Sequence, residues 1–331
     1  MNQFEFAQPK TEDQAVELLS ERKSSAILGS GMDIVTLLQK NLIDAERVVD
    51  VSAIESLRGI QADGSGNVTI GALTTLEALS QNPMLADYPT LNDVIHGIRA
   101  IQVQQTGTIG GDLCHLPNCW YFRSGYGLFG REGKKSLPEV GDNRYHAIIG
   151  NDGPAKYVSA SRFAPGLISL GAEVRIVGPQ PGTEKWISLE QFYRTPKHEQ
   201  HGVTVLEPGQ LLTHLRIPRD DFRLNATYEV LETQGLDWPL AAAAVSLKLN
   251  DGIVDEARVV LGHVAPVPWV SQVAARCLIG QPVDRHSAEL TGRAAVANAT
   301  PLKHNVYKVQ LTRTAVARAI LKATEQLEGG L

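Results

Sequence analysis

The N-terminal part of the chain has a pattern of apolar and polar positions that predicts a small α/β unit. Thr11 stands three residues before Gln14, as in a capping box, and apolar residues then recur at helical spacing. Short apolar runs at 26–28 and 47–51 predict two buried strands with a helical turn between them. We therefore expect a first subdomain over residues 1–58.

A second unit follows, and it contains a long irregular stretch. Strand patterns occur at 67–71 and 215–217, and helical patterns lie between them. Residues 112–151 are rich in glycine, proline, asparagine and aromatic residues, and they form a longer segment than a plain connection inside a domain needs. We expect this long loop to reach toward a site or a partner. Pro218 marks the end of the second subdomain, predicted over 59–219.

The remaining residues, 220–331, form a third predicted unit. Apolar segments at 241–249 and 257–261 indicate strands of a sheet. A long amphipathic helix is expected over 306–327, closed by two glycines at 329–330.

Composition narrows the classes of protein to which the chain can belong. With 331 residues, 43% of them hydrophobic and 20% charged, it is long enough for two or three globular domains. The net charge of −5 and the scattered lysines and arginines argue against nucleic acid as a partner. The sequence lacks a secretory signal and an apolar stretch of membrane-spanning length, so we expect a cytoplasmic protein without direct membrane insertion. A periplasmic location would need an export signal on a partner subunit.

Two glycine-rich turns are the main candidate binding features. Residues 29–33 read G-S-G-M-D and residues 107–112 read G-T-I-G-G-D, and an apolar run precedes each turn. Glycine permits positive φ and lets backbone N–H groups approach an anion closely, so the pair predicts a long anionic ligand such as a dinucleotide. Neither turn matches a P-loop or Rossmann fingerprint, and either one alone would more often be structural.

Four segments, in order along the chain, resemble the FAD-binding subunit of the molybdenum hydroxylases. This family includes carbon monoxide dehydrogenase, xanthine dehydrogenase and bacterial aldehyde oxidoreductases. Residues 28–34 resemble its A-G-G-T-D-L turn, and residues 106–113 resemble its G-T-I-G-G-N-L turn. Residues 161–174 resemble the segment that follows the second turn, and 260–268 resemble the G-x-V-A-P-x-P stretch of the C-terminal domain. The resemblance covers nearly the whole chain.

The resemblance implies an α+β fold of the PCMH type. Two α/β subdomains would enclose the cofactor FAD and precede a small α+β domain with a three-stranded antiparallel sheet and helices. The pyrophosphate of FAD would lie on residues 29–33, while residues 107–111 would approach its ribityl chain and isoalloxazine ring. No catalytic acid or base and no metal ligand is expected in this chain. The residues expected to bind FAD are Ile27, Leu28, Gly29, Ser30, Gly31, Met32, Asp33, Ile34, Thr106, Gly107, Thr108, Ile109, Gly110, Gly111, Asp112, Arg162 and Leu212.

The same resemblance implies a role in electron transfer. Electrons would come from a large subunit with a molybdenum cofactor, pass through 2Fe–2S clusters in a small subunit, reach FAD and leave to NAD⁺, oxygen or a quinone. One alternative is a stand-alone flavin oxidoreductase, which would need its own base near the flavin. Another is a non-catalytic assembly subunit that has lost FAD, although the retained glycines argue against it.

Several positions depart from the family pattern or allow two interpretations. Arg162 and Glu229 stand where the family commonly has an aspartate and often a lysine. Arg162 would alter flavin affinity or potential through its charge, or pair with a phosphate or a surface acid. Asp33 would contact the ligand or cap the next helical turn with equal probability. Trp238, beside an apolar run, is expected in the core.

The cysteines offer a further alternative. Cys114, Cys119 and Cys277 are odd in number and favour a reducing compartment. Residues 118–123 resemble the start of an insertion that, in one subfamily, carries cysteines for a 4Fe–4S cluster. Such a cluster usually takes four thiolates, so we expect a cluster-free loop with free thiols at 114 and 119. Zinc bound with His115 and His146 is the minor alternative.

Overall fold

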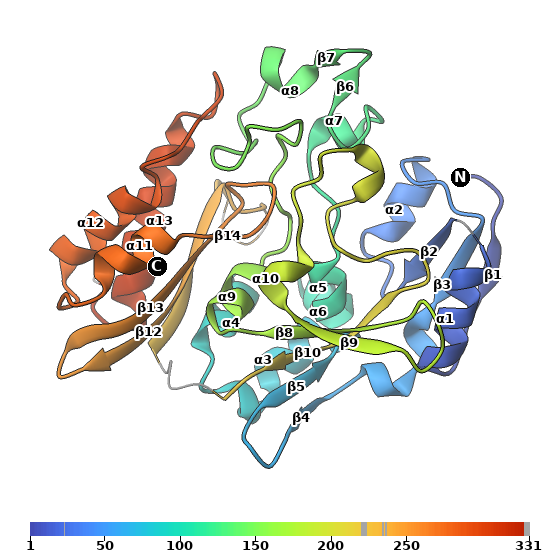
Figure 1. Cartoon of the computed structure of the whole chain (residues 1–331), viewed down its shortest axis with the longest axis horizontal. Helices are drawn as coiled ribbons and strands as arrows, with labels where there is room; N and C mark the ends of the chain where they lie inside the picture. The colour runs from blue at the N-terminus through green and yellow to red at the C-terminus, as the bar shows by residue number, and fades with distance from the viewer. Residues whose placement is uncertain (23, 220–223, 234, 236, 328–331) are drawn as a thin grey trace.

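Three larger sheets organise the computed structural model, which describes residues 1–22, 24–219, 224–233, 235 and 237–327 (Figure 1). The N-terminal sheet lies at one end of the molecule, a five-stranded sheet lies in the middle, and the C-terminal sheet with its helices lies at the other end. This mixture of helix and sheet matches the predicted α+β fold class. The predicted domain boundaries near 58 and 219 stay predictions.

The N-terminal sheet is parallel and carries the first glycine turn at the end of its edge strand. Its strands, in spatial order, are β1 (Glu5–Ala7), β3 (Arg47–Asp50) and β2 (Ser25–Leu28). Helix α1 (Glu12–Glu21) begins as predicted, because the Thr11 hydroxyl accepts a hydrogen bond from the backbone N–H of Gln14. The helix buries Ala15, Val16 and Leu19 in a core shared with β3. The predicted strands and first helix are confirmed.

The central sheet is antiparallel, and the largest cluster of buried apolar residues packs against it. Its strands, in spatial order, are β4 (Ile60–Ala62), β5 (Val68–Gly71), β10 (Leu211–Ile217), β8 (Glu173–Val177) and β9 (Glu184–Ser188). Four helices pack with it: α3 (Leu76–Gln81), α4 (Pro89–Gly97), α9 (Ala164–Ser169) and α10 (Leu189–Phe192). Helix α5 (Ile101–Thr106) leads into the second glycine turn.

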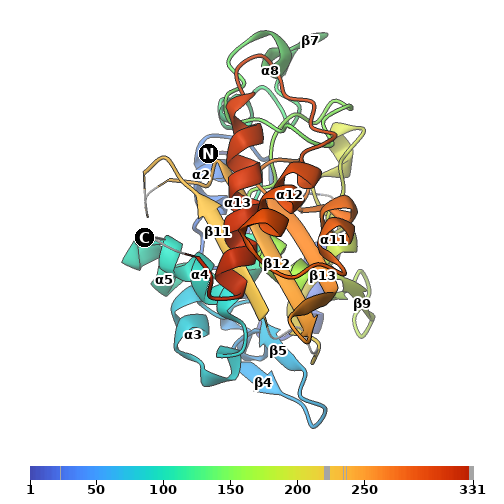
Figure 2. The same cartoon turned by 90° about the vertical axis from the view of Figure 1, so that its left-hand side faces the viewer.

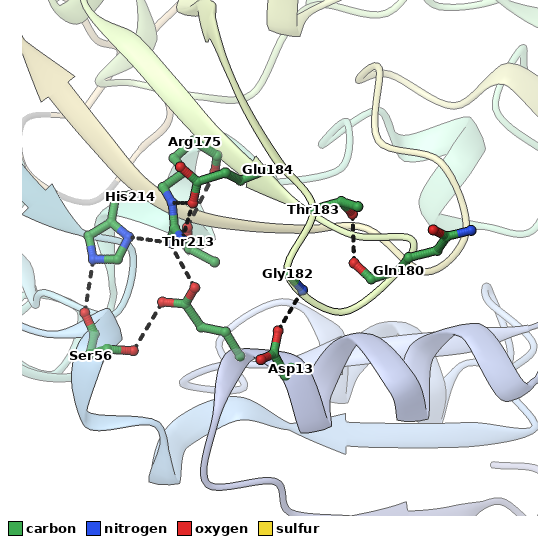
Figure 3. A network of polar contacts seen from close by, with 10 residues as sticks. Asp13, Ser56, Arg175, Gln180, Gly182, Thr183, Glu184, Thr213 and His214 are labelled. Atoms are coloured by element: carbon green, nitrogen blue, oxygen red, sulfur yellow. Dashed lines mark hydrogen bonds and ion pairs between the residues drawn. The ribbon is translucent and has the colours of Figure 1, made fainter.

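A polar network fixes the first subdomain against the central sheet (Figure 3). Arg175 of β8 contacts Glu12 of α1 through Nη1 and Oε2 at 2.7 Å and also donates to the Thr213 hydroxyl. His214 of β10 contacts the Ser56 carbonyl at 2.9 Å, and the Gly182 N–H donates to Asp13. These contacts set the position of the first subdomain, which carries the first turn, relative to the central sheet, and the second turn is hydrogen-bonded to residues 72 and 74 just after β5 of that sheet.

The long loop contains short elements that its lack of periodicity did not predict. They are α7 (Trp120–Arg123), β6 (Arg131–Glu132), β7 (Lys135–Ser136) and α8 (Leu137–Val140). The second glycine turn before them forms the short helix α6 (Ile109–Leu113). Part of the loop projects beyond the sheets in Figure 1.

The end of this loop is held by the C-terminal domain. The backbone N–H of Thr300 donates to the Ile148 carbonyl at 2.7 Å, and that of His304 donates to Asn143 at 2.8 Å. The buried ammonium group of Lys308 donates to the carbonyls of Tyr145, His146 and His263. The loop is thus fixed by residues far along the chain, such as His304, which follows Asn143 by 161 positions.

The C-terminal sheet is antiparallel, and helices cover its outer face (Figure 2). It contains β11 (Leu224–Val230), β12 (Ala241–Asn250), β13 (Ile253–Gly262) and β14 (Trp269–Val270). The three long strands are those implied by the resemblance, and the two-residue β14 is an additional edge strand. The helices are α11 (Gln272–Leu278), α12 (Arg285–Ala295) and α13 (Tyr307–Ala323).

Helix α13 ends earlier than its apolar pattern predicted. The helix stops at Ala323, and Glu325 has φ of 58°, which no residue of a right-handed helix adopts. The expected closure at 329–330 lies outside the described residues. Across the described part of the chain, no helix is long and apolar enough to cross a membrane.

Candidate functional site

A cavity of about 510 Å³ lies where the N-terminal sheet, the central sheet and the long loop meet. Both glycine turns line it. Every residue predicted to bind FAD lines this cavity except Leu28, Thr106 and Ile109. Leu28 packs in the first subdomain, Ile109 lies in the central core, and Thr106 points its hydroxyl at the Met32 sulfur, 3.2 Å away. The turns therefore meet at one site although 73 residues lie between them in the sequence.

The first turn offers free backbone donors. Gly31 has φ of +82°, a conformation that favours glycine. Within the described residues, the N–H groups of residues 30–33 have no acceptor, although they follow directly on a paired strand. Successive unpaired N–H groups in such a turn form a concave site for an anion. This geometry fits the pyrophosphate of a dinucleotide.

Most backbone N–H groups of the second turn already donate hydrogen bonds within the protein. The N–H groups of Ile109 and Gly110 donate to the carbonyls of Thr74 and Ala72, and the N–H of Gly111 donates to the Thr108 hydroxyl. A Cβ on Gly110 would lie 2.8 Å from the Ala72 carbonyl oxygen, so this glycine is required by packing. These N–H pairings leave few free amides in the second turn for an anion, and its expected approach to the ribityl chain and isoalloxazine ring stays a prediction. This turn forms a smooth cavity wall.

Asp33 ends the first turn, and its side chain makes no cap. It lies at the N-cap of α2 (Ile34–Gln39), but its carboxylate contacts the Arg123 guanidinium at 2.5 Å and the His115 ring at 3.7 Å. Arg123 also donates to two carbonyls of the long loop. Of the two roles considered for Asp33, the capping role is wrong, and contact with a ligand stays a prediction. In the structure, Asp33 joins the first turn to the loop.

Asp112 ends the second turn and organises the segment that follows it in space. Its carboxylate accepts hydrogen bonds from the Ser161 hydroxyl and from the N–H groups of Arg162 (3.1 Å) and Phe163 (3.2 Å). Burial raises the pKa of Asp112, and these donors oppose that shift. Asp112 therefore places Arg162 at the cavity wall.

Arg162 forms a buried ion pair with Glu229 of β11. The Nε–Oε1 distance is 2.9 Å, a second contact joins the two groups, and the two side chains are 9% and 5% exposed. Burial raises the pKa of Glu229, while the arginine opposes the shift. A surface acid as the partner of Arg162 is thus wrong, because Glu229 is buried. The two departures from the family pattern are the two halves of one ion pair.

Other lining residues carried no usable sequence signal. Trp238 is 38% exposed, so its expected place in the core is wrong. Its ring lies 5.0 Å from that of His115, and both side chains line the cavity. An isolated aromatic residue before a proline carries no pattern that separates such a position from a buried one.

The cysteines do not gather into a site. Cys114 lines the cavity, and burial raises the pKa of its thiol to about 12. Cys119 contacts His146 Nε2 at 3.3 Å, and Cys277 lies in α11. Among the residues that the structure describes, no three His, Cys, Asp or Glu side chains converge as metal ligands, so the predicted zinc alternative lacks its ligand set.

Comparisons with known proteins agree on one protein family. A family profile described as the FAD binding domain in molybdopterin dehydrogenase matches residues 2–220, and the CO dehydrogenase flavoprotein C-terminal domain matches residues 226–323. The carbon monoxide dehydrogenase medium chain of Hydrogenophaga pseudoflava is 26% identical over 323 residues, which cover 96% of each chain. The aldehyde oxidoreductase FAD-binding subunit of Escherichia coli K12 is 23% identical and covers 98% of this chain and 100% of its own.

A solved structure shares the fold. A chain of carbon monoxide dehydrogenase from Hydrogenophaga pseudoflava that lacks the Mo-pyranopterin moiety superposes with a TM-score of 0.77, at 22% identity, over 98% of both chains.

Proposed function

Because the chain belongs to the family of FAD-binding domains in molybdopterin dehydrogenases, we propose that it transfers electrons within a multi-subunit molybdenum hydroxylase. It is an FAD-binding oxidoreductase component. In the proposed complex, a large subunit with a molybdenum cofactor and a small 2Fe–2S subunit supply electrons. An external acceptor, NAD⁺, oxygen or a quinone, removes them.

The observation that carries the proposal is the unpaired row of N–H groups at residues 30–33, at the edge of a cavity large enough for a cofactor. These groups would bind the pyrophosphate, and Gly31 would keep its surroundings free of a side chain. The wall built by Gly110 and Gly111 would let a flat group approach closely. FAD, when bound, supplies one- and two-electron redox chemistry.

The side chains around the cavity support electron transfer rather than substrate chemistry. Asp112 accepts three internal hydrogen bonds, Glu229 is paired with Arg162, and Asp33 is paired with Arg123. These carboxylates hold the cavity in shape and are occupied by internal partners. A stand-alone oxidoreductase would need a base in reach of a bound substrate.

The experiment that tests this proposal is purification of the tagged chain from the cell that makes it, followed by analysis of FAD, iron and molybdenum. We expect FAD together with iron and molybdenum from co-purifying subunits. A chain that purifies alone with FAD and oxidises a substrate would support the stand-alone enzyme. A chain that co-purifies with the metals but cannot bind FAD would support the assembly subunit.

A further inference from the structure

A second cavity, of about 210 Å³, adjoins the first and is formed by the long loop, the segment before β12 and helix α13. We propose that this second cavity binds a quinone, the acceptor that removes electrons from FAD. The inference rests on the proposed function, because it assigns the acceptor for the same cofactor.

The second cavity contains polar groups that lack partners. The Tyr157 hydroxyl, His146 Nδ1 and His263 Nε2 are buried, and within the described residues they have no hydrogen-bond partner. Each of the three side chains is 2% exposed and lines the cavity. Leaving a buried polar group unpaired costs stability, so three in one small cavity indicate a ligand that pairs with them.

All three groups can act as neutral donors. Burial lowers the pKa of His146 to about 4 and that of His263 well below its ordinary value, so both rings are uncharged near pH 7. Burial also raises the pKa of the Cys119 thiol, which therefore keeps its proton. If that thiol donates to His146 Nε2, the ring hydrogen lies on the unpaired Nδ1. A ligand with carbonyl oxygens would satisfy such donors.

The walls favour a flat, uncharged ring. Trp120, Tyr145 and Trp238 line the cavity beside Tyr157, which gives it aromatic surfaces. Glu232 and Asp237 also line it, so a ligand with phosphates would meet negative charge. Of the lining residues that the structure describes, the only lysine or arginine is Lys308, and its ammonium already donates to three carbonyls. A quinone fits this chemistry, and a nicotinamide dinucleotide does not.

Trp238 connects this cavity to the first one. It lines both cavities, and its ring lies 5.0 Å from His115 on one side and 6.4 Å from His263 on the other. A quinone in the second cavity would therefore lie beside the FAD site. It would take two electrons and two protons from reduced FAD and leave as the hydroquinone, while FAD returns to its oxidised form.

The test uses the full chain loaded with FAD, and duroquinone as the probe. Duroquinone carries four methyl groups, so no ring C–H is left for addition of the Cys119 thiol. Quenching of tryptophan fluorescence measures its Kd, because Trp120 and Trp238 line the cavity. We expect saturable quenching in the wild type and a Kd about five- to tenfold higher in Tyr157→Phe, which removes one hydrogen bond. His263→Asn should weaken binding similarly, and its φ of 59° suits asparagine.

Thermal stability distinguishes a role of Tyr157 in quinone binding from a purely structural role. Tyr157→Phe removes an unpartnered hydroxyl, so its Tm should stay equal or rise while quinone binding weakens. The matched control is Tyr193→Phe, whose hydroxyl donates to the Leu113 carbonyl. That variant should lose Tm and keep the quinone Kd of the wild type.

Reoxidation of reduced FAD completes the test. Tyr157→Phe should slow reoxidation by duroquinone and leave that by ferricyanide unchanged. Three results would overturn the inference and leave the proposed function standing. They are a chain that holds FAD but shows no saturable quenching, a quinone Kd in both the Tyr157 and His263 variants equal to that of the wild type, and NAD⁺ binding that depends on Tyr157. Failure to co-purify with iron and molybdenum would contradict the proposed function, whereas the duroquinone Kd would still report on this cavity.

Discussion

The two glycine turns look alike in sequence and differ in what their glycines do. At the first turn, Gly31 has positive φ and the neighbouring N–H groups are free. At the second, most of the N–H groups are paired within the protein, and Gly107 and Gly110 pack against the backbone of Val103 and Ala72. A glycine-rich motif at a binding site therefore has two separable functions: it exposes donors to a ligand, or it lets two protein segments approach each other.

The ion pairs behind the two turns differ in the same way. Asp33 and Arg123, behind the first, keep 19% and 16% of their side chains exposed, whereas Arg162 and Glu229, near the second, are almost fully buried. Water can therefore partly replace the lost partner in the ion pair behind the first turn. The wall near the second turn depends on a buried ion pair that water does not reach. Disruption of the second wall should cost more stability, and disruption of the first should cost more ligand affinity.

Loss of the buried ion pair should have the largest effect. Glu229→Gln leaves the Arg162 charge buried without its partner, and we expect the free energy of unfolding to fall by about 3–5 kcal/mol. Asp33→Asn, at the more exposed pair, should cost no more than about 1 kcal/mol. Urea unfolding of both variants measures the difference. The double variant Arg162→Met with Glu229→Leu should recover most of the loss, and a double variant as unstable as the single one would contradict this account.

Gly110→Ala should have the next largest effect. The new Cβ would lie 2.7 Å from the Cβ of Ala72 and 2.8 Å from its carbonyl oxygen, so backbone must move, at a cost of about 1–3 kcal/mol in unfolding free energy. Gly64→Ala is the control, since its Cβ would enter open space. Equal stability of the two variants in urea unfolding would show that Gly110 is not needed for packing.

Acid should destabilise the folded chain through His263 of the second cavity. Burial holds the pKa of His263 well below its ordinary value of about 6.5, so at lower pH the unfolded chain binds a proton that the folded chain does not. The free energy of unfolding should therefore fall as pH falls below about 6.5, by about 2 kcal/mol between pH 7 and pH 5 for this residue. Unfolding curves across this range should be less pH-dependent in His263→Asn. An unchanged dependence in that variant would assign the acid sensitivity to other groups.

Gly31→Ala should change stability least and ligand binding most. Its φ of +82° costs alanine about 1 kcal/mol, and the atom nearest to the new Cβ would be Val35 Cγ2 at 3.2 Å. We expect the Kd for FAD to rise about tenfold, because the N–H groups of the turn must shift. Gly59→Ala is the matched control, with φ of +92° and open space around it. If both variants bound FAD equally well in a fluorescence titration, the first turn would not be the anion site.

The sequence alone predicted the elements whose structure depends on neighbouring residues. Thr11 caps α1 because its hydroxyl meets an N–H three residues away, and β2 can be recognised as a short apolar run before a glycine turn. The different functions of the two turns could not be predicted from the sequence, because the donors of the second turn meet their acceptors in residues 72 and 74 only after folding.

Contacts between residues far apart in the sequence also could not be predicted from local patterns. Arg162 and Glu229 are 67 positions apart, and each alone reads as an isolated departure from a family pattern. The three unpaired groups of the second cavity come from segments around 146, 157 and 263, and only the folded chain brings them together. Pairing of buried charges and of buried donors is thus decided by tertiary structure.

The contacts between the long loop and residues 300–308 also determine when the second cavity can form during synthesis. Asn143, Ile148 and His146 leave the ribosome long before their partners Thr300, His304 and Lys308 are made. Because domains fold as units from the N-terminus while the chain grows, both glycine turns can be in place while this loop still lacks its contacts. A newly made chain therefore completes the second cavity only with its last tenth, and a chain stalled on the ribosome before Thr300 still lacks the Lys308 side of that cavity.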